Sequence, residues 1–139
     1  MSIDHDVVVD EIHTLHRDLA RWLGGADRQA VERFVAQLHP DFSMVGLDGV
    51  VVPRARRVEG RRGGGGTAPG LTIEIVDIEQ LHRTSDGAVM RFEEVHRGPE
   101  GTAARLTTAL LLQDPQARNG FRWRSVHETA APNRIRSGR

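Results

Sequence analysis

The hydrophobic pattern of this chain has a helical period near its N-terminus and an alternating period beyond a run of glycines. From Val8 to Leu23 the apolar residues recur in steps of three and four, which predicts an amphipathic helix that ends at Gly24 and Gly25. Beyond Gly70 apolar and polar residues alternate over long stretches, as they do in strands with one buried face. A chain with helices first and strands afterwards belongs to the α+β class.

A second helix and a small hairpin are predicted between the first helix and the glycines. Asp27 can cap the helix and Pro40 prevents it from continuing. Short strands at 42–45 and 50–52 flank an Asp-Gly turn, which is typical of a hairpin. Pro53 suits the first position of a third, short helix.

The segment GRRGGGGTAPG at 60–70 is too rich in glycine for regular structure, and we expect a mobile loop. It matches neither dinucleotide-binding nor Walker glycine patterns, because no strand precedes it and the chain has no Lys. Arg57 and Arg61 lie beside it and could clamp a carboxylate or phosphate when the loop closes. The alternative is that they belong to a solvated helix face.

Four strands are predicted after the glycines, at 71–81, 88–97, 102–113 and 121–130. Short turns join the first three strands and a longer loop leads to the last, so the four form an antiparallel meander. A slip of phase at Ile75 and Val76 indicates a β-bulge. Residues 1–132 are therefore interpreted as one domain, and 133–139 as a disordered tail.

Composition excludes several classes of partner and reaction. The 19 basic residues are all Arg and are matched by 19 acidic ones, so a nucleic-acid or anionic-membrane surface is not expected. Schiff-base, thiolate and tyrosine chemistry are excluded, because Lys, Cys and Tyr are absent. All-Arg usage is typical of high-GC bacterial genomes. No stretch is long and apolar enough for a membrane helix and the N-terminus is acidic, which predicts a cytoplasmic protein.

Two motifs in this order resemble the nuclear transport factor 2-like superfamily, which includes SnoaL-like cyclases and ketosteroid isomerases. They are LHPDFSMVGLDG at 38–49 and FRWRSVHETAAP at 121–132, separated by the meander. The similarity covers residues 7–132. It is closest to a branch described as a domain of unknown function, in which a terminal strand ending His-Glu-Thr recurs.

The resemblance implies a cone-shaped α+β barrel, in which a curved sheet wraps around the helices to form a pocket. It also implies homodimers paired through the sheet. It implies no single reaction, because the fold supports isomerases, cyclases, dehydratases, hydrolases and binding modules. The isomerases use a Tyr in their oxyanion hole, and since this chain has none, steroid isomerase activity of that kind is not expected.

Strand alternation selects the candidate pocket residues. Glu94 and His127 are predicted to face the pocket and to transfer protons, because a carboxyl desolvated among aromatic side chains has a pKa near neutrality. The alternative is that Glu94 pairs with an Arg such as Arg105 and His127 is structural. A bulge between Phe92 and Glu94 would invert this face. The other predicted pocket residues are Phe42, Met44, Met90, Phe92, His96, Trp123 and Ser125.

A metal site can be drawn on the first helix from Asp10, His13 and His16, but histidines at this spacing are more often solvent-facing. We therefore expect neither metal nor cofactor. The sequence leaves two functions open. One is a cofactor-independent acid–base enzyme, an isomerase, cyclase, dehydratase or hydrolase, acting on a small apolar or amphipathic molecule. The other is a non-catalytic ligand-binding, dimerisation or scaffold module.

Overall fold

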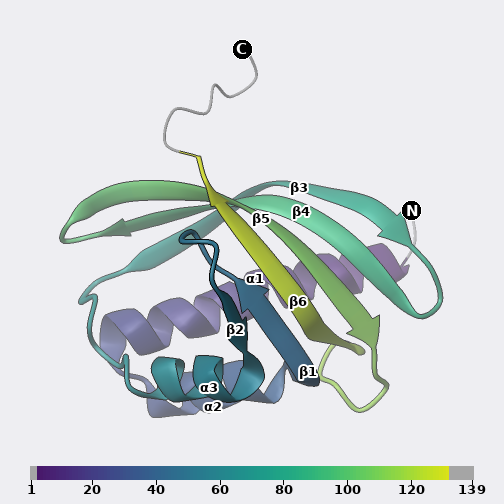
Figure 1. Ribbon diagram of the computed structural model, residues 1–139, viewed down its shortest axis with the longest axis horizontal. Helices are drawn as coiled ribbons and strands as arrows, with labels where there is room; N and C mark the ends of the chain where they lie inside the picture. The colour runs from purple at the N-terminus through teal and green to yellow at the C-terminus, as the bar shows by residue number, and fades with distance from the viewer. Residues whose placement is uncertain (1–2, 132–139) are drawn as a thin grey trace.

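A computed structural model describes residues 3–131 and has two layers, a curved sheet and three helices on one of its faces (Figure 1). The α+β class and the N-terminal position of the helices are confirmed. The predicted tail at 133–139 lies outside the described residues. Within the described part of the chain, no helix combines the length and apolar character needed to cross a membrane.

The three helices follow the predicted signals. Helix α1 spans Ile3–Gly25, α2 spans Arg28–Ala36 and α3 spans Arg54–Arg62. The side chain of Asp27 accepts hydrogen bonds from the amides of Gln29 and Ala30, which satisfies two free donors at the start of α2. Pro53 stands directly before α3, where its missing amide costs nothing.

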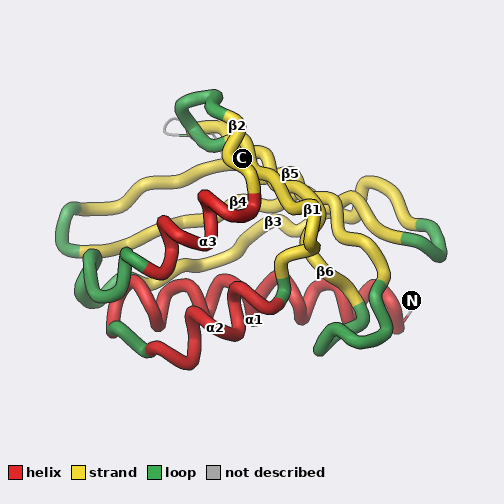
Figure 2. The backbone as a smooth tube through the Cα atoms, turned by 60° about the horizontal axis from the view of Figure 1, so that its bottom comes forward, coloured by secondary structure: helices red, strands yellow, loops and turns green. Residues whose placement is uncertain are grey.

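The sheet has six strands in the order β2-β1-β6-β5-β4-β3. The strands are β1 (Leu38–Val45), β2 (Val51–Pro53), β3 (Thr72–Arg83), β4 (Gly87–Gly98), β5 (Gly101–Gln113) and β6 (Phe121–Ala130). The predicted hairpin and meander are both present. They join through a parallel pairing of β1 with β6, which the sequence analysis did not predict. Figure 2 shows all three helices on the same side of this sheet.

Bulges in β3 and β6 change which side chains face the helices. The predicted bulge in β3 exists but lies later, since the pairing with β4 shifts between Val76 and Glu79 and Asp77 has φ of 56°. The second bulge was not predicted and lies in β6, where Leu110 pairs with Ser125 but Leu111 pairs with Trp123. The extra residue reverses the alternation of β6 beyond Trp123.

Helix α1 buries a carboxylate as well as apolar side chains against the sheet. Glu11 is fully buried and accepts four hydrogen bonds. Arg118 donates two of them, at 2.8 and 3.0 Å, Asn119 donates one at 2.9 Å and the indole of Trp123 donates one at 2.9 Å. These bonds compensate the burial of the charge and hold the loop before β6 against α1.

A second buried carboxylate extends this network. Asp18 accepts hydrogen bonds from Arg33 of α2 at 2.9 and 3.1 Å and from Arg118 at 2.9 Å. Arg118 thus lies between two carboxylates of α1. Helix α1, helix α2 and the β5–β6 loop are joined by one set of charge-assisted hydrogen bonds.

The glycine-rich segment is attached to the end of α1. Backbone amides of Gly66, Ala68 and Gly70 donate hydrogen bonds to carbonyls of residues 22–24, at 3.0, 2.9 and 3.1 Å. A Cβ at Gly65 would overlap the ring of Trp22. The expectation of a mobile loop is not supported by these contacts. At position 65, glycine is needed for close packing.

This packing predicts opposite effects for two Gly→Ala substitutions. Gly65→Ala should lower the free energy of unfolding by about 1–3 kcal/mol, because the new methyl group overlaps the Trp22 ring. Gly60→Ala is the matched control, since Gly60 lies within α3 with open space around its Cα. It should raise the free energy by about 0.5–1 kcal/mol. Urea denaturation measures both, and equal effects would contradict the packing argument.

Candidate functional site

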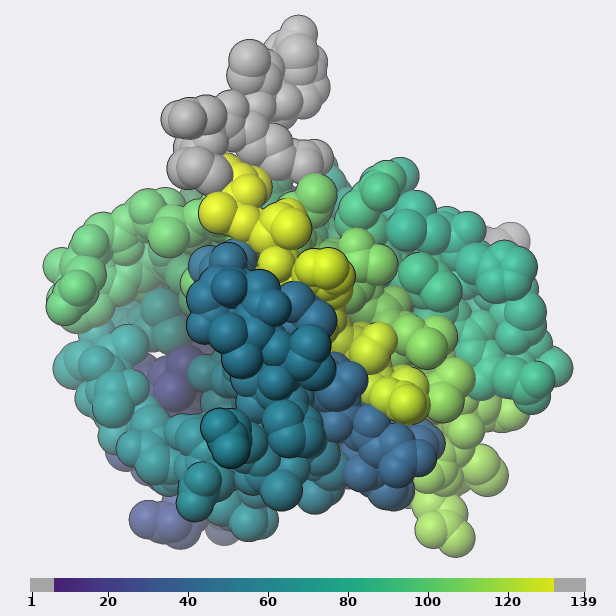
Figure 3. Space-filling model, viewed as in Figure 1, coloured from purple at the N-terminus to yellow at the C-terminus, as the bar shows by residue number. Residues whose placement is uncertain are grey.

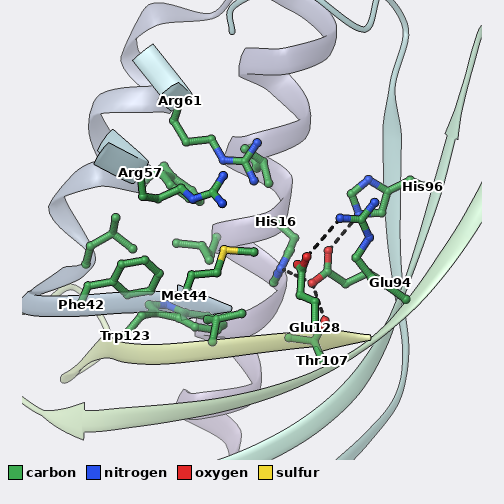
Figure 4. A pocket seen from close by; sticks show the side chains of 16 residues that line it. His16, Phe42, Met44, Arg57, Arg61, Glu94, His96, Thr107, Trp123 and Glu128 are labelled. Atoms are coloured by element: carbon green, nitrogen blue, oxygen red, sulfur yellow. Dashed lines mark hydrogen bonds and ion pairs between the residues drawn. The ribbon is translucent and has the colours of Figure 1, made fainter. Parts of the chain in front are cut away.

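A cavity lies between the concave face of the sheet and the helices (Figure 4). Its volume is about 40 Å³, measured as the space open to the centres of water molecules. That space holds roughly three waters. One wall is apolar and the other is charged. The lining residues are Leu15, His16, Leu19, Phe34, Leu38, Phe42, Met44, Arg57, Arg61, Glu94, His96, Arg105, Thr107, Trp123, Val126 and Glu128.

A wider groove adjoins the cavity at His96, which lines both. The groove measures about 440 Å³ by the same definition and runs between the glycine-rich segment and the β4–β5 turn. In Figure 3 it corresponds to the hollow between the teal and green segments on the left of the molecule.

Glu94 of β4 is the centre of the charged wall. The carboxylate is 2% exposed, and both of its oxygens have partners. His96 donates to Oε1 at 2.9 Å, Thr107 donates to Oε2 at 2.8 Å, and His16 Nε2 lies 3.3 Å from Oε2. Burial works against the charged form, but the charge and hydrogen bond of His16 and the hydrogen bond from His96 hold the pKa of Glu94 well below its usual range. Glu94 is therefore an ionised carboxylate that only accepts hydrogen bonds.

His16 of α1 is the counter-ion of Glu94. Its Nδ1 donates to the carbonyl of Ile12 at 2.8 Å, so a neutral ring would turn the lone pair of Nε2 toward the carboxylate. A proton on both nitrogens removes that repulsion. Burial lowers the pKa of His16, but Glu94 outweighs it and the net pKa is raised above 6.5. His16 is thus a buried imidazolium.

His96 differs from His16 because only one of its two ring nitrogens, Nε2, forms a hydrogen bond with the described residues. Its Nε2 must carry a proton, since ionised Glu94 can only accept. Within residues 3–131, no hydrogen bond to Nδ1 is formed, so in the neutral ring the lone pair of Nδ1 is available. A histidine oriented by a carboxylate through one nitrogen can accept a proton at the other.

Glu128 of β6 is a second acid in the cavity. Arg105 of β5 donates to it at 3.2 Å. Burial, and then the charge of Glu94, raise the pKa of Glu128 above its ordinary value despite the opposing effect of Arg105. The alternative pairing of Arg105 with Glu94, considered from the sequence, is wrong, because Arg105 bonds to Glu128.

Arg57 and Arg61 of α3 form the cationic end of the cavity. Neither makes an ion pair with any of the described residues, and the Nε of each is buried without a hydrogen-bond partner. Burial, and then the charge of Arg57, lower the pKa of Arg61 to about 10. The guanidinium of Arg61 also packs over the Phe34 ring at 5.9 Å.

The structure brings together most of the residues predicted from sequence. Of the predicted residues, those that line the cavity are Glu94, His96, Phe42, Met44, Trp123, Arg57 and Arg61. Met90 and Phe92 face the same side but belong to the fully buried core. Ser125 and His127 were placed wrongly, because the β6 bulge turns them away and presents Val126 and Glu128 instead. His127 is exposed and is no partner of Glu94.

Three residues of the charged wall were missed, namely His16, Thr107 and Glu128. His16 had a readable signal, since it is spaced four residues from Ile12 and three from Leu19 on the apolar face of α1. The metal face drawn from Asp10, His13 and His16 does not assemble, because His13 is exposed while His16 is buried. No group of three metal-ligating side chains occurs among the described residues.

Comparison with solved structures places this chain beside an NTF2-like protein of unknown function from Pseudomonas aeruginosa. The two share 35% sequence identity and a TM-score of 0.84, over 90% of this chain and 98% of that one. A proposed dehydratase of the NTF2-like family from Streptomyces avermitilis has 12% identity and a TM-score of 0.73, over 92% and 96% of the two chains.

The CaMKII hub of S. rosetta has 15% identity and a TM-score of 0.70, over 91% of this chain and 95% of that one. At this level of identity, as for the Streptomyces protein, the likeness concerns the fold alone. No family model and no curated protein matches the sequence.

The His16–Glu94 pair predicts a specific dependence of stability on pH. The raised pKa of His16 contributes stability fully below pH 6.5, and this is lost as the pH rises through its folded-state pKa. The lowered pKa of Glu94 contributes above pH 4.5, and this is lost as the pH falls through its folded-state pKa. The pair should therefore contribute most to the free energy of unfolding between pH 4.5 and pH 6.5.

We expect His16→Gln to lower the free energy of unfolding by about 3–5 kcal/mol near pH 6, because Glu94 loses its buried counter-ion. The difference from the wild type should shrink as the pH rises. His13→Gln, an exposed position on the same helix, is the control and should show little change. Guanidinium titrations across the pH range measure this, and a constant loss at all pH values would refute the charged pair.

Proposed function

The chain belongs to the NTF2-like family, and from this premise we propose that its cavity binds a small molecule and transfers a proton to or from it. His96 is the proposed base and Glu94 the carboxylate that orients it. This replaces the Glu94–His127 pair expected from sequence. The observation that carries the proposal is the His96–Glu94 hydrogen bond at the edge of the cavity, with the second nitrogen of the imidazole unused.

The surroundings of Glu94 favour this role. Thr107 and His16 hold one carboxylate oxygen while the other accepts from His96, so the imidazole is fixed in one tautomer and orientation. When His96 takes a proton, the adjacent negative charge of Glu94 stabilises the new imidazolium. The groups are already in place, so little reorganisation is needed at the moment of transfer.

The proposed step is the removal of a proton from a carbon or oxygen of the substrate by Nδ1 of His96. The electron pair stays on the substrate. The proton then returns either to a neighbouring atom, which gives an isomer or a cyclised product, or to a leaving hydroxyl, which departs as water. These steps use only groups of the protein, so no cofactor is invoked. The dehydratase proposed among the structural neighbours is named for a reaction of the second kind.

A second candidate function is a non-catalytic module for binding or assembly. The small free volume of the cavity and the fold shared with the CaMKII hub favour it. In that case the His96–Glu94 pair would be structural. A homodimer paired through the sheet remains compatible with either function.

Both candidates are tested by one screen for ligands that raise the melting temperature of the protein. The ligands found are then incubated with the protein in D2O, and the exchange of their protons for deuterium is measured. The wild-type protein should be stabilised by small amphipathic molecules, because ligands that bind only the folded state shift unfolding by mass action. Bound ligands should then incorporate deuterium or turn over, as detected by mass spectrometry. His96→Gln should lower that rate by about 10²-fold or more, the usual contribution of a general base.

His127→Ala is the matched control, since His127 is exposed and outside the cavity, and its rate should equal that of the wild type. Glu94→Gln should retain part of the binding and lose most of the rate, provided that circular dichroism shows an intact fold. Binding without exchange or turnover would favour the non-catalytic module. An equal rate for His96→Gln and His127→Ala would refute the assignment of the base.

A further inference from the structure

Among the groups that line the cavity, the positive charges outnumber the negative ones. Glu94 is matched by His16, and Glu128 is matched by Arg105. Arg57 and Arg61 have no such partner among residues 3–131, and each keeps a buried Nε without a hydrogen bond. The cavity therefore has two positive charges in excess. Burying a charge without a counter-ion is costly, so this arrangement favours the entry of an anion.

The positions of these groups limit where an anion could bind. Arg57 and Arg61 lie one turn apart on α3, and Figure 4 shows both guanidinium groups reaching into the cavity toward the side that holds Glu94 and His96. A guanidinium offers paired N–H donors that match the two oxygens of a carboxylate. The two carboxylates of the wall would repel an anion bound beside them, so the anion must lie at the arginine end.

We propose that the ligand of this cavity is a small carboxylic acid in its anionic form, with the carboxylate bound between Arg57 and Arg61 and the rest of the molecule directed toward His96. This inference rests on the proposed small-molecule function and names its substrate class.

The size of the cavity is compatible with a small carboxylate. The free volume of about 40 Å³ accommodates a few non-hydrogen atoms, which is the size of a carboxylate and its adjacent carbon. The next atoms of the ligand would reach His96, where the wider groove begins. The proton that His96 removes would then come from an atom close to the carboxylate.

Charge also connects this site to the chemistry. Each proton that His96 accepts adds a positive charge to a cavity that already has an excess of them. A bound carboxylate offsets part of that excess, so it stabilises the charge that the transferred proton brings into the cavity. The same anion relieves the repulsion between Arg57 and Arg61.

The test compares acetate and propionate with their neutral isosteres acetamide and propionamide, at constant ionic strength set with NaCl. We expect the two carboxylates to raise the melting temperature of the wild type in a concentration-dependent manner, and the amides to leave it unchanged. Isothermal titration calorimetry gives the affinities. Arg57→Gln and Arg61→Gln should each weaken carboxylate binding by about tenfold or more.

Arg56→Gln is the matched control, because Arg56 is the exposed neighbour of Arg57 on α3 and does not line the cavity. It should bind as the wild type does. Arg57→Lys retains the charge but not the paired donors, and should have intermediate affinity. Without ligand, Arg57→Gln should unfold no more easily than the wild type, because an unpaired charge has been removed. A marked loss of stability would indicate a structural role and overturn the proposal.

Other outcomes separate this inference from the proposed function. Equal carboxylate binding by Arg57→Gln and Arg56→Gln overturns the carboxylate site, while exchange that still depends on His96 leaves the acid–base function standing. Stronger stabilisation by inorganic phosphate than by the carboxylates overturns the substrate class. Carboxylate binding that depends on Arg57 and Arg61, without any exchange or turnover, supports this site and refutes the enzyme.

Discussion

The buried polar face of α1 determines where the helix lies and therefore what the site contains. Three ionisable residues, Glu11, His16 and Asp18, share this face with the apolar residues and are almost fully buried. Each must meet a partner, because an uncompensated charge in the core costs several kcal/mol. Glu11 and Asp18 meet Arg118, and His16 meets Glu94. A small shift of α1 would break all of these contacts together, so the helix has one position on the sheet.

The structural network and the site differ in how well their charges are matched. Around Arg118, both carboxylates have several donors, as expected for groups that stabilise the fold. At Arg57 and Arg61 two guanidinium groups approach each other without an acid between them. A protein keeps such a local conflict where function requires it, since packing alone would remove it. This contrast supports the anion site that we propose at the arginine end of the cavity.

The sequence predicted the elements of this fold well and their long-range pairing less well. Periodicity and turn signals located α1, the meander and the hairpin, because these depend on local residues such as Asp27 and Pro53. The parallel pairing of β1 with β6 joins segments some eighty residues apart in the chain, and no local signal encodes it. In the site, Glu94 was found because β4 alternates regularly, whereas His127 was misplaced because one extra residue in β6 reverses its faces. The residues around Arg124 carry no sequence signal that predicts this bulge.

Trp123 connects the structural network to the site. Its indole donates to Glu11, while its ring meets the imidazole of His16 edge-to-face at 5.9 Å. Phe92 packs against the same imidazole at 5.4 Å, so His16 is enclosed by two aromatic rings. This enclosure limits the contact of His16 with water and lowers the local dielectric constant, which strengthens the attraction between His16 and Glu94 even as it raises the cost of burying them. The β6 bulge follows directly after Trp123, so a single strand places an indole in the core and the carboxylate of Glu128 in the cavity. The irregularity that reverses the faces of β6 is thus the feature that allows the core and the cavity to meet on one strand.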